Sequence, residues 1–232
     1  MATFAFIHGA GDVGWYWHLV EAELRRRGHE TVAPDLPVED DGAGLDRYAD
    51  AVVAAIGDRD DVVVVAQSFG GYVAPLVAER VAARLIVLVA GMVPRPGESA
   101  EEMFRTTGWA PAPGVGGGTR ALFYHDVPDD LAEEAMGHGR SQSETPGAEP
   151  WPLPAWPDIP SRFVLCSDDR FFPAPWLGAV VRDRLGLVPD EIESGHCPAL
   201  SRPVELATML EGYLGAEAVA GRQRREPESR RD

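Results

Sequence analysis

The chain has 232 residues, a length that suits one α/β domain with a small insertion. Its formal net charge of -16 argues against nucleic acid or an anionic membrane as a partner. No run of about 18 apolar residues occurs, so we expect no membrane-spanning segment. The first residues lack a basic region and indicate a strand rather than a signal peptide. Cys166 and Cys197 have neither disulfide-framework nor zinc-site spacing, so we expect a protein of the reducing cytoplasm.

Strand and helix patterns alternate along the chain, which predicts βαβ units and a mostly parallel sheet of about six strands flanked by helices. In chain order we expect a strand at 3–8, a helix at 15–27, a strand at 30–33, a helix at 45–56, a strand at 62–66, a helix at 69–80, strands at 85–90 and 162–166, a helix at 176–185, a strand at 190–192 and a helix at 203–214. Ser201 is a plausible N-cap of the last helix.

The alternation stops between residues 94 and 160. This stretch holds a glycine run, a helical patch at 129–136 and a string of prolines and tryptophans. A loop of this length without structure is improbable in a compact domain, so we predict an inserted cap. The core then comprises residues 1–93 and 161–214. Residues 215–232 are small and charged and predict a disordered tail.

A serine stands at the expected turn between the strand at 62–66 and the helix at 69–80. The strand is a continuous apolar run, as in a buried parallel sheet. Small residues two before and two after Ser68, Ala66 and Gly70, allow a sharp turn that exposes the hydroxyl above the sheet. The free N–H groups of the following helix favour an anion nearby. The pattern is typical of an activated nucleophile.

A serine nucleophile needs a base within hydrogen-bond reach and an acid that orients the base. Sites in open parallel sheets gather at the carboxyl ends of the strands. His196 follows the last expected strand, and Asp168 and Asp169 follow the strand at 162–166. The resulting order of serine, aspartate and histidine is the one that accompanies a nucleophile elbow.

Four motifs together resemble the α/β-hydrolase superfamily: FIHGAG at 6–11, AQSFGG at 66–71, SDD at 167–169 and GH at 195–196. The chain is most similar to the compact lid-bearing branch that includes plant methyl-ester esterases and hydroxynitrile lyases, over nearly all residues up to about 214. The resemblance implies an α/β-hydrolase fold with Ser68 as nucleophile and His196 as base. It also implies an oxyanion hole formed by the backbone N–H groups of Ala10 and Phe69.

The resemblance favours Asp169 as the acid. In the family the acid often stands three residues after a small residue that ends the strand, and a proline follows. Cys166, Asp169 and Pro173 fit this spacing. Asp168 would then point elsewhere.

Three positions depart from the pattern. Ala66 stands where the superfamily usually has glycine, although alanine is common there. Gly9 stands where the lyases of this branch carry a threonine, and Cys197 where they carry a lysine. The last two departures favour hydrolysis over cyanohydrin cleavage.

We therefore expect a serine hydrolase that cleaves a small carboxylic ester, thioester or lactone through an acyl-enzyme, without metal or organic cofactor. The expected cap is rich in aromatic and methionine side chains, which suggests a largely apolar substrate: Met103, Phe104, Trp109, Phe123, Tyr124 and Met136. Two alternatives stay open. The same fold and triad could serve a lyase, a C–C hydrolase or an acyltransferase, or the pocket could belong to a non-catalytic small-molecule binder.

Overall fold

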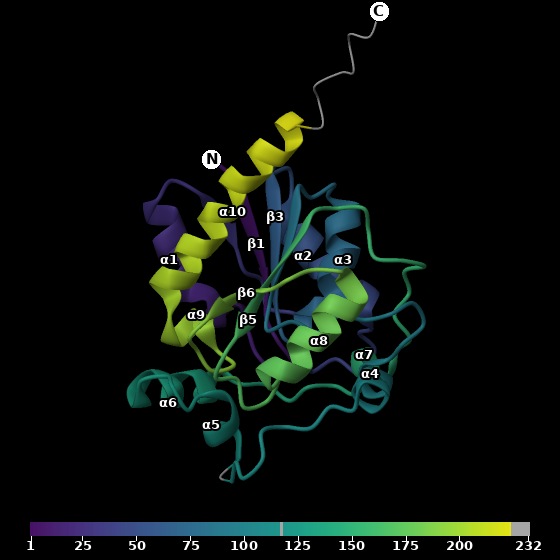
Figure 1. Ribbon diagram of the computed structural model, residues 1–232, viewed down its shortest axis with the longest axis vertical. Helices are drawn as coiled ribbons and strands as arrows, with labels where there is room; N and C mark the ends of the chain where they lie inside the picture. Colours follow the sequence, from purple (N-terminus) through teal and green to yellow (C-terminus); the bar gives the residue numbers. More distant parts are fainter. Residues whose placement is uncertain (117, 224–232) are drawn as a thin grey trace, which may run out of the picture.

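The computed structural model describes residues 1–116 and 118–223, in which helices flank a six-stranded sheet (Figure 1). The strands are β1 (Thr3–Ile7), β2 (Glu30–Val32), β3 (Val62–Gln67), β4 (Leu85–Val89), β5 (Ser161–Cys166) and β6 (Asp190–Ile192). They are all parallel and follow the order β2-β1-β3-β4-β5-β6. The expected α/β-hydrolase architecture is confirmed.

The centre of the sheet forms the core because its strands are apolar on both faces. Val63, Val64 and Val65 of β3 are fully buried, as parallel strands covered by helices must be. The register pairs Ala66 with Ile7 on one side and with Leu88 on the other. The carboxyl ends of β1, β3 and β4 therefore meet at one edge of the sheet.

Helices cover both faces of the sheet. Outside residues 94–160, the segment expected to form a cap, they are a 3-10 turn (Gly14–Trp17), α1 (His18–Arg26), α2 (Leu45–Ile56), α3 (Gly70–Arg80), α8 (Ala174–Leu185), α9 (Pro198–Ser201) and α10 (Pro203–Gln223). In Figure 1, α1 and α10 lie on one side of the sheet and α2 and α3 on the other. The helix expected at 15–27 is divided, because its first turn is a 3-10 turn.

The C-terminal helix α10 begins at Pro203 as expected, but its end and its N-cap differ from expectation. It continues to Gln223, so residues 215–223, expected in a tail, are helical; residues 224–232 lie outside the described residues. Ser201 belongs to the preceding short helix α9, and its Oγ lies 2.8 Å from Oγ of Ser194 instead of capping α10. The stretch after Leu214 is rich in alanine, the residue with the highest helix propensity, and this favours a helix over the tail that was expected from its small and charged residues.

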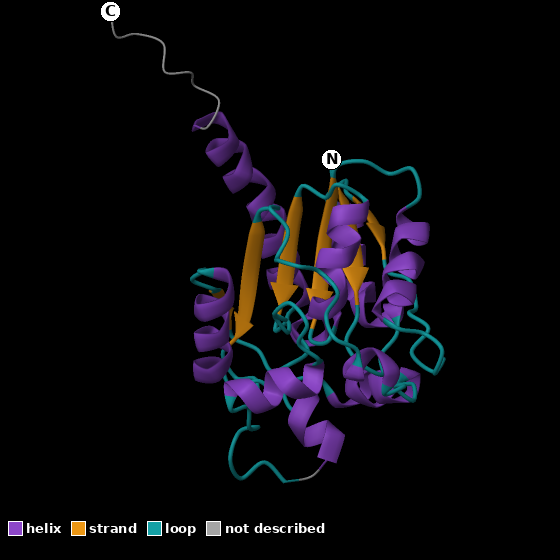
Figure 2. Cartoon of the chain, turned by 90° about the vertical axis from the view of Figure 1, so that its right-hand side faces the viewer, coloured by secondary structure: helices purple, strands orange, loops and turns teal. Residues whose placement is uncertain are grey.

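Between β4 and β5, the described residues form four helices: α4 (Ala100–Thr107), α5 (Gly118–Phe123), α6 (Asp129–His138) and α7 (Thr145–Ala148). They lie beyond the carboxyl ends of the strands, where the arrowheads point in Figure 2. Sequence periodicity indicated only α6. The start of α4 has a capping box in which Ser99 Oγ accepts from the Glu102 N–H and the Glu102 side chain accepts from the Ser99 N–H.

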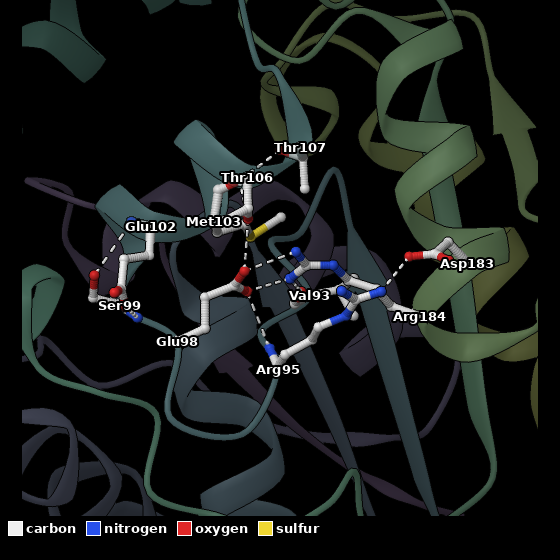
Figure 3. Close-up of polar contacts among 10 residues, drawn as sticks. All are labelled: Val93, Arg95, Glu98, Ser99, Glu102, Met103, Thr106, Thr107, Asp183 and Arg184. Carbon is white, nitrogen blue, oxygen red and sulfur yellow. Dashed lines mark hydrogen bonds and ion pairs between the residues drawn. The ribbon is translucent and has the colours of Figure 1, made fainter.

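A buried ion pair fixes the beginning of this segment to the core (Figure 3). Arg184 of α8 donates from both terminal nitrogens to the carboxylate of Glu98, and one of them also donates to Val93 O at 2.6 Å. Thr106 Oγ1 and the Arg95 N–H donate to the same carboxylate. Although partial burial disfavours ionisation, the hydrogen bonds from Arg184 and Thr106 lower the pKa of Glu98.

Across the residues that the structure describes, every helix is too short or too polar to cross a lipid bilayer.

Candidate active site

Ser68 lies in a sharp turn between β3 and α3. Its φ of 52° is a left-handed conformation that is strained for a serine. The two glycines that follow make this turn possible. A Cβ at Gly71 would overlap the backbone of Met92, and a Cβ at Gly70 would come within 3.0 Å of His8 O. The turn therefore depends on close backbone approach on two sides.

The loop after β1 lies directly against Ser68. A Cβ placed on Gly9 would lie 3.1 Å from the Ser68 Cβ and would overlap the Gln67 side chain. Ala10, the next residue, lines the same two cavities as Ser68. Phe69 follows Ser68 directly at the start of α3. The structure thus brings together both residues expected to form an oxyanion hole.

His8 supports this loop and is fully buried. Its Nε2 accepts the N–H of Leu36 at 3.1 Å, which leaves the proton on Nδ1 for the carbonyl of Gly9 at 2.9 Å. Burial lowers the pKa of His8 to about 4, although the bond to Gly9 opposes the shift. His8 is therefore neutral at physiological pH, and both of its ring nitrogens form hydrogen bonds that stabilise the loop.

His196 and Asp169 form a buried hydrogen-bonded pair. The His196 Nδ1 lies 2.7 Å from the Asp169 Oδ2, and both side chains are almost inaccessible to solvent. The other oxygen of Asp169 accepts the backbone N–H groups of Phe171 and Phe172 at 2.8 and 2.9 Å. With these bonds the carboxylate is fixed in direction, and so is the imidazole that it faces.

Asp168 points elsewhere. Its side chain is exposed, and its backbone makes the local hydrogen bonds: the N–H donates to Ser194 O at 3.0 Å, and the carbonyl accepts from His125 Nε2 at 3.1 Å. Of the two neighbouring aspartates, Asp169 is therefore the one that contacts His196. The spacing that favoured Asp169 agrees with this geometry.

Aromatic rings surround the imidazole of His196. The rings of Phe123, Phe171 and Phe172 stand edge-on to it, with centroids 5.2–5.3 Å away. Gln67, the residue before the serine, donates from Nε2 to the His196 carbonyl at 3.2 Å. These contacts hold the histidine loop beside the end of β3 and exclude bulk water from the ring.

Two cavities meet at Ser68. The first, here called the Phe104 cavity, has a volume of about 510 Å³ and is lined by Ala10, Ser68, Phe69, Met92, Ala100, Glu101, Phe104, Gln142, Ser143, Glu144, Gly147, Ala148 and Phe171. The second, the His196 cavity, has a volume of about 440 Å³ and is lined by Gly9, Ala10, Gly11, Asp12, Gln67, Ser68, Thr119, Phe123, Tyr124, Met136, Gly139, Arg140, Phe171, His196 and Cys197. Only Ala10, Ser68 and Phe171 belong to both.

The cap helices divide between the two cavities. Helices α4 and α7 contribute to the Phe104 cavity, and α5 and α6 to the His196 cavity. Figure 1 shows the two pairs at opposite sides of the carboxyl edge of the sheet. Of the apolar cap residues expected near the substrate, Phe104, Phe123, Tyr124 and Met136 line a cavity. Met103 is buried in the core, and Trp109 packs on Phe104 instead.

Sequence patterns did not indicate three of the residues near Ser68. Phe171 lines both cavities, Asp12 lines the His196 cavity, and Gln142 lines the Phe104 cavity. Asp12 and Gln142 lie on irregular segments, where no periodicity assigns a direction to a side chain. For Asp12, the sequence offered one indication that it lies near Ser68, namely its position four residues after His8 in the loop that follows β1.

Cys197, the residue after His196, is buried. Burial raises its pKa well above the ordinary value, and the pKa of Cys166 rises for the same reason. Both cysteines are therefore thiols at neutral pH rather than thiolates. Among the described residues, no cluster of three or more histidine, cysteine or carboxylate side chains has the arrangement of a metal site.

Comparison with known proteins agrees with this geometry. The model of the alpha/beta hydrolase family matches residues 4–209. The chain belongs to the alpha/beta hydrolase family. This membership agrees with the topology of the sheet and with the turn at Ser68.

Several curated relatives of this alpha/beta hydrolase are named esterases. A carbendazim hydrolyzing esterase from Nocardioides sp. (strain SG-4G) is 31% identical over 110 residues, which are 43% of this chain and 46% of that protein. The probable esterase PIR7A of Oryza sativa subsp. indica is 39% identical over 89 residues, or 33% of each chain. The chain thus matches less than half of the length of these relatives.

Solved structures share the fold over nearly the whole chain. Polyneuridine aldehyde esterase superposes with a TM-score of 0.77 at 21% identity and covers 92% of this chain and 99% of its own. A methylesterase from Arabidopsis superposes with a TM-score of 0.76 at 18% identity and covers 93% and 99%. At these identities the comparison shows the fold alone.

Proposed function

We propose that this alpha/beta hydrolase is a serine esterase in which Ser68 attacks a carboxylic ester, His196 is the general base and Asp169 orients the base. The single observation that carries the proposal is the buried hydrogen bond between His196 and Asp169 beside the cavity that Ser68 shares. A base held in one orientation next to a strained serine is the arrangement that activates a hydroxyl.

The proposed reaction has two steps. His196 Nε2 takes the proton of Ser68 as Oγ bonds to the carbonyl carbon, and the N–H groups of Ala10 and Phe69 stabilise the oxyanion. The bond to the leaving oxygen then breaks, and His196 gives that oxygen its proton. Water, activated by His196, cleaves the acyl-enzyme and releases the acid. Asp169 holds the proton of the imidazole on Nδ1 throughout.

The site favours hydrolysis over cyanohydrin cleavage. A side chain at Gly9 would press on the Ser68 Cβ, so the loop has no room for the threonine hydroxyl of the similar lyases. Cys197 is an uncharged buried thiol and supplies no cation beside the histidine. Both features favour attack of Ser68 on the carbonyl group of an ester.

The substrate class follows from the lining of the cavities and from the relatives. Both cavities carry aromatic and methionine side chains, which suits a largely apolar ester, thioester or lactone. The relatives that are named esterases support the same reaction class.

A serine-directed fluorophosphonate probe tests the nucleophile. We expect labelling of the wild-type chain at Ser68 and none in the Ser68→Ala variant, with p-nitrophenyl butyrate hydrolysis lost in the same variant. Folded wild-type protein that resists the probe contradicts the proposal and favours a small-molecule binder. Equal ester turnover by the two proteins contradicts the mechanism.

A further inference from the structure

In the proposed reaction, the two cavities that meet at Ser68 hold different parts of the ester. The proposed base, His196, lines the His196 cavity and not the Phe104 cavity, whereas Phe69, one proposed oxyanion donor, lines the Phe104 cavity and not the His196 cavity. During acylation the leaving oxygen takes its proton from His196, so the leaving group must lie on the His196 side. The acyl group then extends into the Phe104 cavity.

The two cavities differ in the groups that could recognise a substrate. The Phe104 cavity is lined by apolar residues together with the polar side chains of Gln142 and Ser143, and its two carboxylates belong to exposed side chains. The His196 cavity is also largely apolar, but its wall includes a partly buried carboxylate and a partly buried phenol, from Asp12 and Tyr124. A partly buried carboxylate therefore distinguishes the leaving-group side.

Asp12, which lines this second cavity, has one carboxylate oxygen that no described residue uses. Its Oδ1 accepts the N–H of Val13 at 2.8 Å, which fixes the direction of the carboxylate. Its Oδ2 has no hydrogen-bond partner in the described part of the chain, and the carboxylate forms no ion pair there. Burial raises the pKa of Asp12 to about 6, partly offset by the Val13 bond, so the group is ionised at neutral pH.

We propose that Asp12 selects esters whose leaving group carries a hydrogen-bond donor, a hydroxyl or an N–H, within reach of the carboxylate. The proposal rests on the esterase function above and names the substrate class of that site. An apolar leaving group would displace water from Asp12 and leave a charged acceptor unpaired, whereas a donor replaces the lost hydrogen bond. We expect a preference of about 10- to 100-fold in kcat/KM for the donor-bearing ester.

Two esters test this selection: 2-hydroxyethyl butyrate and 2-methoxyethyl butyrate. They share the acyl group and the first two carbons of the alcohol, and a methyl group replaces the hydroxyl hydrogen in the second ester. The change in the ratio of their kcat/KM values between wild type and a variant of Asp12 therefore isolates the donor from the added methyl group. For the wild-type protein we expect a ratio of about 10 or more in favour of the hydroxyethyl ester.

Asp12→Asn is the matched variant. It keeps an oxygen for the Val13 N–H and replaces the free acceptor with an N–H₂ donor, so the ratio should fall to about one or below. The control is Asp40→Asn, which changes an aspartate outside both cavities whose Oδ1 likewise accepts a backbone N–H, that of Gly42 at 2.8 Å. We expect the control to keep the wild-type ratio.

The outcomes separate the two proposals. Hydrolysis of both esters at equal rates by the wild-type protein, or an unchanged ratio in Asp12→Asn, overturns the role of Asp12 and leaves the esterase function intact. Absence of Ser68 labelling together with absence of hydrolysis of either ester overturns the esterase function and this assignment with it. A fall of the ratio in Asp12→Asn alone supports the proposal.

Discussion

Gly11 and Gln142 are 131 positions apart and share a hydrogen bond, in which the Gly11 N–H donates to Gln142 Oε1 at 2.9 Å. The Arg140 N–H donates to the carbonyl of Gly11 at 2.7 Å, so the segment before α7 binds both backbone groups of this glycine. Gly11 has a φ of 67° and follows Ala10 directly. The cap thereby fixes the loop that carries a proposed oxyanion donor.

Replacing Gln142 should slow the reaction by loosening this loop. We expect Gln142→Ala to lower kcat by about 2- to 10-fold, because one hydrogen bond contributes about 0.5–1.5 kcal/mol. Affinity for a boronic acid, whose tetrahedral adduct occupies the oxyanion hole, should fall by a similar factor. The control is Tyr48→Phe, which removes a hydroxyl bonded to Gln142 Nε2 but keeps the contact with Gly11. Equal effects of the two variants would contradict the positioning role.

Substitutions of Asp168 and Asp169 should differ strongly in their effect on kcat. Asp169→Asn should lower kcat by about 10⁴, as expected when the imidazole loses the carboxylate that fixes its tautomer. Asp168→Asn should change kcat little, because its side chain is exposed and takes no part in the bond to His196. Steady-state kinetics with p-nitrophenyl butyrate measures both. The opposite ranking would exclude Asp169 as the acid.

His8 should make the fold sensitive to acid. Its folded pKa of about 4 lies below the unfolded value of 6.5, so between these values the unfolded chain binds a proton that the folded chain does not. Stability is therefore complete above pH 6.5 and falls as the pH drops, by up to about 3 kcal/mol for this group alone. Urea unfolding from pH 7.5 to pH 4.5 measures the loss.

A variant isolates the contribution of His8 from those of other titrating groups. His8→Asn removes the titration while keeping one donor and one acceptor, so its stability should decline less steeply over the same pH range. Parallel stability curves for the wild-type protein and the variant would refute this prediction.

The Glu98–Arg184 pair should contribute strongly to stability, whereas its neighbour should not. The side chains of Arg184 and Glu98 are only 3% and 10% exposed, and loss of one partner leaves the other charge buried. We expect Glu98→Ala to lower the free energy of unfolding by about 3–5 kcal/mol.

The nearby Arg95–Asp183 pair, also drawn in Figure 3, is the matched control. Its side chains are 57% and 64% exposed, so Asp183→Ala should cost at most about 1 kcal/mol. Urea denaturation of the three proteins measures the difference. Similar losses for both variants would contradict the burial argument.

Local sequence patterns determined the sheet and the turn at Ser68. Four consecutive valines before a small residue, a serine and two glycines define a buried strand and a close backbone approach, and both depend on near neighbours in the chain. The rule that sites gather at the carboxyl ends of parallel strands predicted that Ser68, His196 and one of Asp168 and Asp169 lie together, and the resemblance to the family favoured Asp169.

Only the tertiary structure decided what surrounds Ser68. The family spacing favoured Asp169 over Asp168, but its bond to His196 depends on the direction in which each side chain leaves one short loop, which only the folded chain fixes. The cavity positions of Asp12 and Gln142 depend on contacts between irregular segments far apart in the chain. Such segments have no period that assigns side chains to a face, so their directions arise from packing and hydrogen bonds that form only when the cap meets the core.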